Sequence, residues 1–348
     1  MKQNFNLDKL IRANVKNLAP YSSARDEFTD FDKEMIFLDA NENPFDTDIN
    51  RYPDPQQKQL KIKISAIKNL SIDSILLGNG SDEVLDLLFR AFCEPNKDNV
   101  ITLPPTYGMY KVLAGINTVE NREVFLNEDF SLNVHEILKT QDINSKLLFI
   151  CSPNNPTGNI FSEENITELL NNFNGIVVID EAYIDFARSE SWIQRLSEYE
   201  NLIVTQTFSK AYGMAGIRLG MCFASSKIIE VLNKIKPPYN VNELTQERAL
   251  NVLNDNNKIN NEIYSLKVNK EFLFKELLQV NWVQKIYPSE ANFLLVKVDN
   301  ATKRYTQLIE SGIVVRNRST QPLCENTLRI TVGTKEETNR LISVLQNI

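Results

Sequence analysis

The chain has 348 residues, of which 42% are hydrophobic, and its formal net charge is -7. This length suffices for one large hydrophobic core and a smaller one, and the balance of 38 basic and 45 acidic residues argues against nucleic acid as a partner. No apolar run reaches the length of a membrane span, and the N-terminal segment MKQNFNLDKL lacks the apolar region of a signal peptide.

Cysteine and histidine usage limits the chemistry further. The four cysteines lie far apart and form no CxxC pair, so neither a zinc site nor a disulfide framework is predicted. We expect them to be small buried side chains in a reducing cytoplasm. The single histidine, His135, lies on an expected surface helix. A metal site or triad built on several histidines is therefore excluded, and proton transfer is left to Lys, Asp, Glu or Tyr.

The first 30 residues are predicted to form an arm. A short helix is expected over residues 8–15, and the PYSSAR segment at 20–25 is either a linker or a substrate-contacting loop. Residues 35–45, MIFLDANENPF, are predicted to form a short apolar strand that ends in a polar turn. In the irregular RYPDP segment that follows, Tyr52 is either a surface residue or a ligand or interface contact.

A glycine-containing turn is expected within residues 75–92, ILLGNGSDEVLDLLFRAF. A short apolar strand runs into Gly80 and Ser81, and an amphipathic helix follows. Ser81 is the expected N-cap, and Asp82 and Glu83 suit the positive end of the helix. Free N–H groups at such a turn can bind an anion, although a well-capped helix alone also explains the pattern. The dinucleotide fingerprint and the P-loop signature are both absent.

Four further apolar strands each end in polar residues. They are expected near 99–103, 146–151, 175–180 and 201–207, and helical segments alternate with them. This alternation predicts a mostly parallel sheet covered by helices, whose carboxyl ends share one edge. The polar residues at that edge would be Tyr107, Asn155, Asp180, Tyr183 and Lys210.

The segment TFSKAYGMAGIRLG, residues 207–220, follows the last of these strands. It places Lys210 eight residues before Arg218, among three glycines. A buried lysine is costly unless it is paired or used in chemistry, and one such use is a covalent link to an aldehyde cofactor. The alternative is an ordinary lysine in a surface loop, and this segment alone favours neither interpretation.

The pattern changes after residue 240. A long helical stretch at 243–279, with a break near 254–257, precedes three short strand patterns, NFLLVKV, GIVVRNR and TLRITVG. Thr334 and Glu337 predict a capping box at the start of the last helix. Arg316 and Arg329 lie on the strands and are either paired surface residues or anion-binding groups. We therefore predict an arm at 1–30, a large domain at 31–239 and a small α+β domain at 240–348.

The segments SPNNPTG, VVIDEAY and TFSKAYGMAGIRLG together resemble the fold-type-I aminotransferases that depend on pyridoxal phosphate. With PYSSAR, LDANENPF, RYPDP, GNGSDE and PPTYGMY added, the chain resembles the class II family of histidinol-phosphate aminotransferases from about residue 18 to 333. The resemblance implies an α/β fold: a large domain with a mostly parallel central sheet covered by helices, plus a smaller α+β C-terminal domain. The implied reaction is a ping-pong transamination of L-histidinol phosphate with 2-oxoglutarate to imidazole-acetol phosphate and glutamate, in histidine biosynthesis.

The resemblance also implies roles at the cofactor ring. Lys210 would hold pyridoxal 5'-phosphate covalently and move the substrate proton, and Asp180 would pair with the pyridine nitrogen. Asn155 and Tyr183 would donate to the phenolate oxygen of the ring, and Tyr107 would stack on its face. Lys210, Asp180 and Tyr183 are thus the implied catalytic residues.

The remaining implied roles concern the two anionic ends of the site. The cofactor phosphate would be bound by Gly80, Ser81, Asp82, Ser209 and Arg218. Tyr52 would reach this phosphate from the other subunit of a homodimer with shared active sites. Arg329 would bind the carboxylate of the amino donor, and the substrate-binding residues implied in all are Tyr21, Asn41, Arg316 and Arg329.

Two alternatives stay open at this point. An aromatic amino-acid aminotransferase or a phosphoamino-acid decarboxylase of the same family would use a similar pocket, although PYSSAR and Arg316 favour a phosphorylated substrate. A cofactor-binding regulator without turnover would be expected to carry an added DNA-binding segment, and the N-terminal region shows no basic domain.

Overall fold

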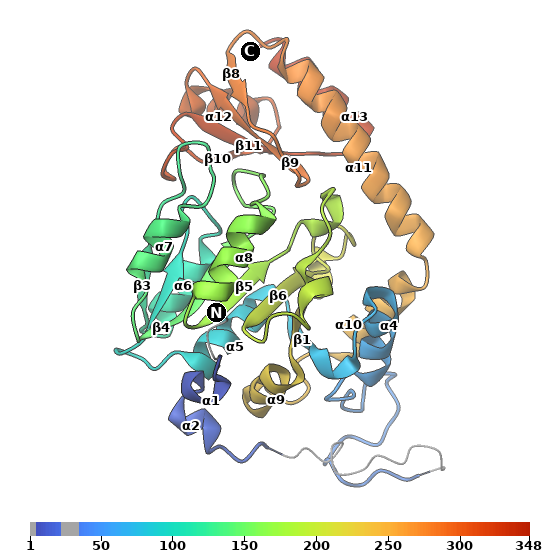
Figure 1. Ribbon diagram of the computed structural model, residues 1–348. Helices are drawn as coiled ribbons and strands as arrows, with labels where there is room; N and C mark the ends of the chain where they lie inside the picture. Colours follow the sequence, from blue (N-terminus) through green and yellow to red (C-terminus); the bar gives the residue numbers. More distant parts are fainter. Residues whose placement is uncertain (1–4, 22–34) are drawn as a thin grey trace.

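The computed structural model describes residues 5–21 and 35–348. Its larger part is built on a seven-stranded sheet, and a four-stranded antiparallel sheet lies at one end of it (Figure 1). In spatial order the large sheet consists of β1 (Ile75–Asn79), β7 (Leu219–Ala224), β6 (Leu202–Thr207), β5 (Ile176–Asp180), β4 (Ser145–Cys151), β2 (Asn99–Thr102) and β3 (Glu120–Glu123).

Strand direction in the large sheet follows from the lengths of the connections. Strands β2 to β6 are parallel to their neighbours in this group, whereas β7 runs antiparallel to both β6 and β1. The link between β6 and β7 spans only residues 208–218, which is too short for the crossover that a parallel pair requires. This hairpin-like return keeps the Lys210 segment at the carboxyl end of β6. The predicted mostly parallel sheet is confirmed.

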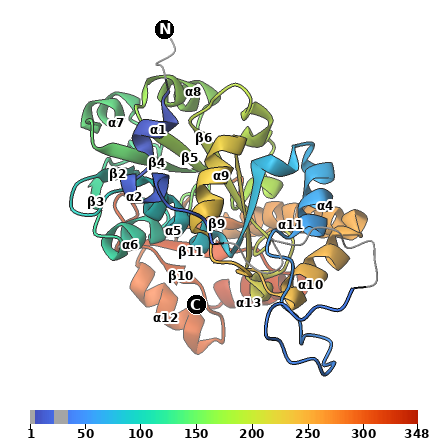
Figure 2. The ribbon, with the colours of Figure 1, turned by 90° about the horizontal axis from the view of Figure 1, so that it is seen from below.

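Helices cover both faces of the large sheet (Figures 1 and 2). Residues of β5 alternate between two core clusters, because successive side chains of a strand point to opposite faces. One face packs on α1 (Leu7–Leu10), α2 (Ala13–Lys16), α5 (Ser81–Phe92), α6 (Met109–Ile116) and α9 (Ser226–Ile235). The other packs on α4 (Lys58–Lys68), α7 (Val134–Thr140), α8 (Glu163–Asn172) and α10 (Glu243–Leu253).

The small sheet has a core of its own. It consists of β10 (Arg316–Asn317), β11 (Thr327–Thr331), β9 (Phe293–Val298) and β8 (Val283–Ile286), packed with α12 (Ala301–Glu310), α13 (Lys335–Leu345) and the end of α11 (Asn256–Leu277). The capping box of Thr334 and Glu337 is present, as predicted. Figure 1 shows α11 running along one side of the molecule from α10 to this sheet.

The break predicted near 254–257 is confirmed, because α10 ends at Leu253 and α11 begins at Asn256. Helix α10 lies beside α4 in both views and packs against it (Figures 1 and 2). Its Ala249 and Leu253 join the core of the large sheet. The predicted domain boundary at residue 240, just before α10, stays a prediction.

Three local predictions were wrong. The single helix expected over residues 8–15 is instead two short helices, α1 and α2, separated by Ile11 and Arg12. Residues 35–45 form no strand; no strand of the described residues pairs with them, and the side chains of Ile36 and Leu38 are 87% and 85% exposed. Helix α5 is capped by Gly80 and not by Ser81, because Gly80 adopts a left-handed φ of 79° and Ser81 is already helical.

Strands β3 and β8 were not anticipated, since both are short and largely polar. The short 3-10 helices are η1 (Ile72–Ser74), η2 (Ile184–Phe186), η3 (Trp192–Arg195) and η4 (Ala215–Ile217).

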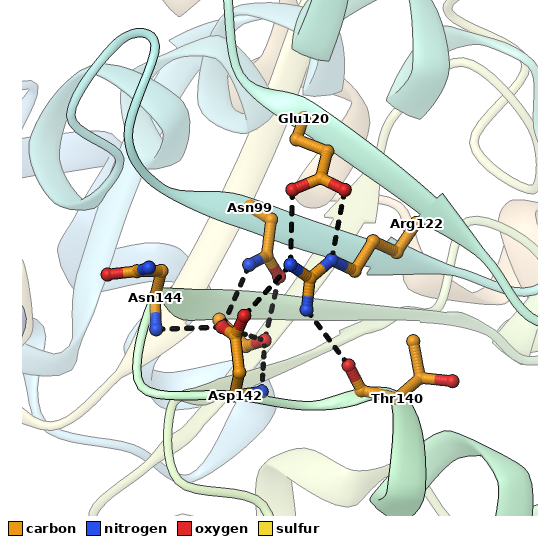
Figure 3. A network of polar contacts seen from close by, with 7 residues as sticks. Asn99, Glu120, Arg122, Thr140, Asp142 and Asn144 are labelled. Carbon is orange, nitrogen blue, oxygen red and sulfur yellow. Dashed lines mark hydrogen bonds and ion pairs between the residues drawn. The ribbon is translucent and has the colours of Figure 1, made fainter.

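A polar cluster fixes the amino ends of β2, β3 and β4 (Figure 3). Arg122 contacts Glu120 at 3.1 Å and Asp142 at 2.8 Å, and it donates to the carbonyl of Thr140. Asn99 donates to Asp142 at 3.0 Å. Although burial opposes the effect, these hydrogen bonds and the charge of Arg122 lower the pKa of Asp142 to about 2. The cluster holds these strands at the edge opposite to their carboxyl ends.

The four cysteines are free and buried. Within the described residues, no helix is both long and apolar enough to cross a membrane. Among the same residues, no group of three or more His, Cys, Asp or Glu side chains could hold a metal ion.

Candidate active site

A cavity of about 480 Å³ lies at the carboxyl ends of β4, β5 and β6, with β10 and β11 of the small sheet on its far side. Of the catalytic and cofactor-binding residues predicted from sequence, the structure brings together here Ser81, Asp82, Tyr107, Asn155, Asp180, Tyr183, Ser209, Lys210 and Arg218. The small sheet adds the predicted substrate-binding residues Arg316 and Arg329. The position of the cavity therefore agrees with the rule that open parallel sheets bind ligands at the carboxyl ends of their strands.

Besides Gly80, which precedes the lining residue Ser81, three predicted residues do not line this cavity. Tyr21 is 75% exposed, and Asn41 is exposed with a left-handed φ of 55°. Tyr52 is 51% exposed and stacks on Tyr239, with ring centroids 4.5 Å apart. The role predicted for Tyr52 needs a second copy of the chain, so the roles of all three stay predictions. The rest of the PYSSAR loop, residues 22–25, lies outside the described residues.

Lys210 follows β6 and extends into the open cavity, with its Nζ 5.5 Å from the ring centroid of Tyr183. The side chain is exposed, so the argument that a buried lysine must be paired or used in chemistry does not apply to Lys210. Partial desolvation by the cavity walls nevertheless lowers its pKa, and the positive charge of Arg329 adds to this effect. A lowered pKa makes the neutral amine, which is the nucleophilic form, available closer to neutral pH.

Asp180 ends β5 and is 4% exposed. It accepts hydrogen bonds from Tyr110 Oη at 2.7 Å and from the backbone N–H of Ala182 at 3.1 Å. Burial raises its pKa, and these hydrogen bonds oppose the rise only in part. Within the described residues no cationic side chain forms an ion pair with Asp180. A buried carboxylate without a cation fits a ligand that presents a protonated ring nitrogen.

Tyr110 was missed by the sequence reasoning. Its ring is fully buried on α6, stacks on Phe149 at 4.8 Å and meets Tyr107 edge-on at 5.5 Å. Both tyrosines belong to the PPTYGMY segment, three residues apart, and Tyr107 precedes α6 whereas Tyr110 lies on it. That spacing was the available signal, but the partner of Tyr110 is 70 residues away.

The turn between β1 and α5 has the shape of an anion cradle. A Cβ added to Gly80 would lie 2.6 Å from Arg218 Nη2, and one added to Gly220 would overlap the backbone nitrogen of Ser81. Glycine at both positions therefore lets Arg218 and β7 approach the N–H groups that begin α5. Arg218 has a weak ion pair with Asp82, at 3.8 Å. Free helix N–H groups beside a guanidinium fit a phosphate group.

Asn155 connects the two sides of the cavity. Its Oδ1 accepts a hydrogen bond from Arg329 Nη1 at 2.5 Å, which leaves its Nδ2 as the donor for a ligand. The guanidinium of Arg329 also lies 5.2 Å from the ring centroid of Phe293, and the same ring meets Tyr183 edge-on. The loop after β4 and strand β11 are thus joined at the site itself.

Three arginines of the small sheet face the cavity. Arg316 pairs with Arg329 across β10 and β11, and the backbone N–H of Arg318 donates to Thr327 at 2.9 Å. Arg318 was missed, although the alternation in VVRNRS places it on the same strand face as Arg316. Burial and the charges of Arg329 and Arg316 lower the pKa of Arg318 to about 10. No carboxylate in the described part of the chain forms an ion pair with any of the three.

Four other lining residues were not anticipated. Ala182, Thr207 and Ala215 are small and leave room for a ligand, and the buried thiol of Cys151 also lies on the cavity wall. Burial raises the pKa of that thiol. Cys151 is therefore a neutral wall residue and not a nucleophile.

Glu181, next to Asp180, belongs to a buried polar network behind the cavity. It accepts hydrogen bonds from Ser191 Oγ, from the backbone N–H of Trp192 at 2.7 Å and from Gln206 Nε2 at 2.8 Å. Burial raises the pKa of Glu181 to about 7 despite these hydrogen bonds. The network ties the end of β5 to β6 and η3, so it helps to fix the strand end that carries Asp180.

Comparison with known proteins agrees with this fold and this cavity. The model of the family "Aminotransferase class I and II" matches residues 34–345, and the chain belongs to this family. It is 64% identical over 98% of both chains to a protein named histidinol-phosphate aminotransferase from Flavobacterium johnsoniae.

Solved structures with the same architecture include two histidinol-phosphate aminotransferases. The one from Clostridium acetobutylicum superposes with a TM-score of 0.79 at 24% identity and covers 86% of this chain and 91% of that chain. The one from Sinorhizobium meliloti, in complex with pyridoxal-5'-phosphate, also has a TM-score of 0.79, at 22% identity, and covers 86% of this chain and 83% of that chain. At sequence identities of 24% and 22%, the structural similarity shows a shared fold and nothing more.

Proposed function

We propose that this chain transfers the amino group of L-histidinol phosphate to 2-oxoglutarate, with pyridoxal phosphate as its cofactor. One observation carries the proposal: a single cavity joins Lys210 and the buried Asp180 to arginines that no carboxylate of the described residues neutralises. The name of the relative that is 64% identical supports the choice of substrate. The proposed transamination is a step of histidine biosynthesis.

The cavity residues fit the cofactor group by group. Lys210 Nζ would form the covalent link, and the lone carboxylate of Asp180 would face the ring nitrogen. The Gly80 turn, Arg218 and Ser209 would hold the phosphate. Around the ring, the remaining contacts would come from Tyr107, Asn155 and Tyr183. When bound, pyridoxal phosphate supplies an aldehyde that reacts with amines and a ring that accepts electrons from the substrate Cα.

The chain's own residues supply binding and proton transfer. Once the substrate amine has replaced it in the covalent link, Lys210 Nζ would be a free amine with a lowered pKa, able to take the proton from the substrate Cα and to give a proton back within the same cavity. Arg329 binds the anionic group of whichever substrate is present, because a planar guanidinium suits both carboxylate and phosphate. The amino donor and the amino acceptor occupy the site in turn, which gives ping-pong kinetics.

We also propose that two copies of the chain form the working unit. Ile36, Leu38 and Phe45 are 87%, 85% and 77% exposed, so this segment presents an apolar surface to solvent. Pairing with a second copy would bury it and bring Tyr52 of the partner subunit toward the cofactor phosphate. Light scattering during gel filtration should give twice the chain mass of 39.9 kDa. A single-chain mass at assay concentrations would contradict this.

The substrate is tested by steady-state kinetics of the cofactor-loaded protein. We expect kcat/KM with histidinol phosphate to exceed that with phenylalanine by at least about tenfold, since charge-assisted hydrogen bonds contribute about 1.5–3 kcal/mol. A preference for phenylalanine would make the chain an aromatic aminotransferase. Release of carbon dioxide from a phosphoamino acid, without transfer of the amino group to 2-oxoglutarate, would make it a decarboxylase.

A further inference from the structure

The three arginines of the small sheet have different surroundings in the cavity. Arg329 is hydrogen-bonded to Asn155, and among the three it is the one whose charge lowers the pKa of Lys210. Arg316 and Arg318 lie on β10 and in the turn after it, with Arg316 opposite Arg329. Arg329 is thus the one of the three whose charge acts on the reacting amine, and Arg316 and Arg318 are two further guanidiniums on the cavity wall.

We propose that Arg318 is a specificity residue, which binds the phosphate group of the substrate together with Arg316. The proposal rests on the function proposed above and adds a residue to its substrate site. Arg318 lines the cavity, and its backbone is held in place by Thr327, whose carbonyl accepts from its N–H at 2.9 Å, and by Gln321, whose N–H donates to its carbonyl. The position of the Arg318 backbone at the cavity is therefore set by the fold.

Unsatisfied polar atoms mark this place as built for a ligand. The Nε atoms of Arg318 and Arg329 are both buried without a hydrogen-bond partner in the described part of the chain. A buried donor without a partner is costly, and so is the packing of three positive charges together. Burial, together with the same repulsion, lowers the pKa of Arg318. An anion that binds between the guanidiniums would relieve both costs.

The chemistry of the two substrates gives a reason for three guanidiniums in one cavity. Glutamate bears its carboxylate directly on Cα, whereas histidinol phosphate bears a phosphate one carbon and one ester oxygen further out. A phosphate monoester also carries a charge of about -1.5 to -2 at pH 7, against -1 for a carboxylate. Arg329 alone matches the nearer, singly charged group. The more distant and more highly charged group requires a second and a third cation, which are Arg316 and Arg318.

The test removes the guanidinium and the phosphate separately and together. Wild type and Arg318→Gln, both loaded with cofactor, are assayed for kcat/KM with histidinol phosphate and with histidinol, which lacks the phosphate. We expect Arg318→Gln to lose about 10- to 100-fold with histidinol phosphate, the size of one charge-assisted contact. The rate with histidinol should change by less than about threefold. Equal losses with both substrates, or none with either, would overturn the proposal.

Two further variants control for charge and folding. Arg340→Gln removes one positive charge from the exposed face of α13, outside the cavity, and should leave both rates unchanged. Arg318→Lys keeps the charge but loses the planar fork, so it should fall between wild type and Arg318→Gln. If Arg318→Gln does not fold, the lysine variant decides: a selective loss with histidinol phosphate supports the role, and wild-type selectivity refutes it.

A binding measurement separates this inference from the proposed function. Inorganic phosphate is titrated calorimetrically into cofactor-loaded wild type, Arg318→Gln and Arg340→Gln. We expect phosphate affinity to fall at least about tenfold in Arg318→Gln only. If the wild type fails to use histidinol phosphate but this loss is seen, the proposed substrate is wrong and the anion subsite stands. Equal affinities in all three proteins would refute the subsite, whatever the substrate.

Discussion

Tyr110→Phe removes one hydroxyl from the wall of the cavity, and that hydroxyl donates to Asp180 Oδ2 at 2.7 Å. Both side chains are buried, and the ring of Tyr110 keeps its stacking on Phe149 when the hydroxyl is lost. The substitution therefore changes the environment of the carboxylate while leaving the packing of α6 against the sheet nearly intact. After it, the backbone N–H of Ala182 still donates to Asp180.

The size of the effect follows from the bond that is lost. A hydrogen bond to a charged group contributes about 1.5–3 kcal/mol, which corresponds to about one to two pKa units. The bond from Tyr110 favours the ionised form of Asp180, whose pKa burial already raises. Its loss raises that pKa further, so Asp180 becomes neutral at a higher pH. A neutral acid stabilises a protonated ring nitrogen less, and we expect the affinity for pyridoxal phosphate to fall about 10- to 100-fold.

The assay measures cofactor binding and does not depend on turnover. Dissociation constants of the cofactor-free protein are determined for pyridoxal 5'-phosphate and for its analogue with a carbon in place of the ring nitrogen. Tyr110→Phe should weaken binding of the first and leave that of the second nearly unchanged. As pH falls, the loss of cofactor affinity should also begin at a higher pH than in wild type. Tyr199→Phe is the matched control, because that buried tyrosine bonds Arg195 outside the cavity.

Equal weakening for the cofactor and its carbon analogue would refute the reasoning. Such a result would mean that Tyr110 supports the fold of the cavity and does not act through the charge of Asp180. An unchanged pH profile in Tyr110→Phe would lead to the same conclusion.

Three other substitutions test further parts of the site. Lys210→Ala should abolish turnover and prevent covalent attachment of the cofactor after borohydride reduction, detected by mass spectrometry, while the circular dichroism spectrum stays that of wild type. Gly220→Ala places a methyl group against the Ser81 backbone and should cost about 1–3 kcal/mol in urea unfolding; Gly216→Ala, where a Cβ meets nothing within 4 Å, should cost far less, and similar costs for both would argue against the tight cradle. Glu181, with its pKa raised to about 7, binds a proton in the folded state that the unfolded chain has released, so stability should fall as pH rises from about 4.5 to 7. Glu181→Gln should reduce the dependence of the melting temperature on pH in this range. If that dependence is unaltered in the variant, groups other than Glu181 cause it.

The local pattern of the sequence was enough for most of the large sheet. Continuous apolar runs marked β4, β5 and β6, because strands buried on both faces need apolar side chains at every position. The polar residues after each run then had to share one edge, which brought Asn155, Asp180 and Lys210 together. The capping box at Thr334 was equally local, since its residues lie three apart.

Other features depended on contacts between distant parts of the chain. Residues 35–45 carry the apolar character of a strand, yet a strand needs a neighbour, and no strand in the described part of the chain pairs with them. Tyr110 on α6 reached Asp180 because its ring packs on Phe149 of β4, the strand beside β5. Gly220 reached Ser81 because β7 lies beside β1, which leads into α5.

The substrate end of the site shows the same division. The sequence by itself determined that Arg316 and Arg318 share a strand face, because side chains alternate along an extended chain. Which face meets the cavity was decided by the packing of the small sheet beside the carboxyl ends of the large one. Three guanidiniums repel one another, so they would not gather around one space by themselves. They are held there because the packing of the core fixes the strands that carry them.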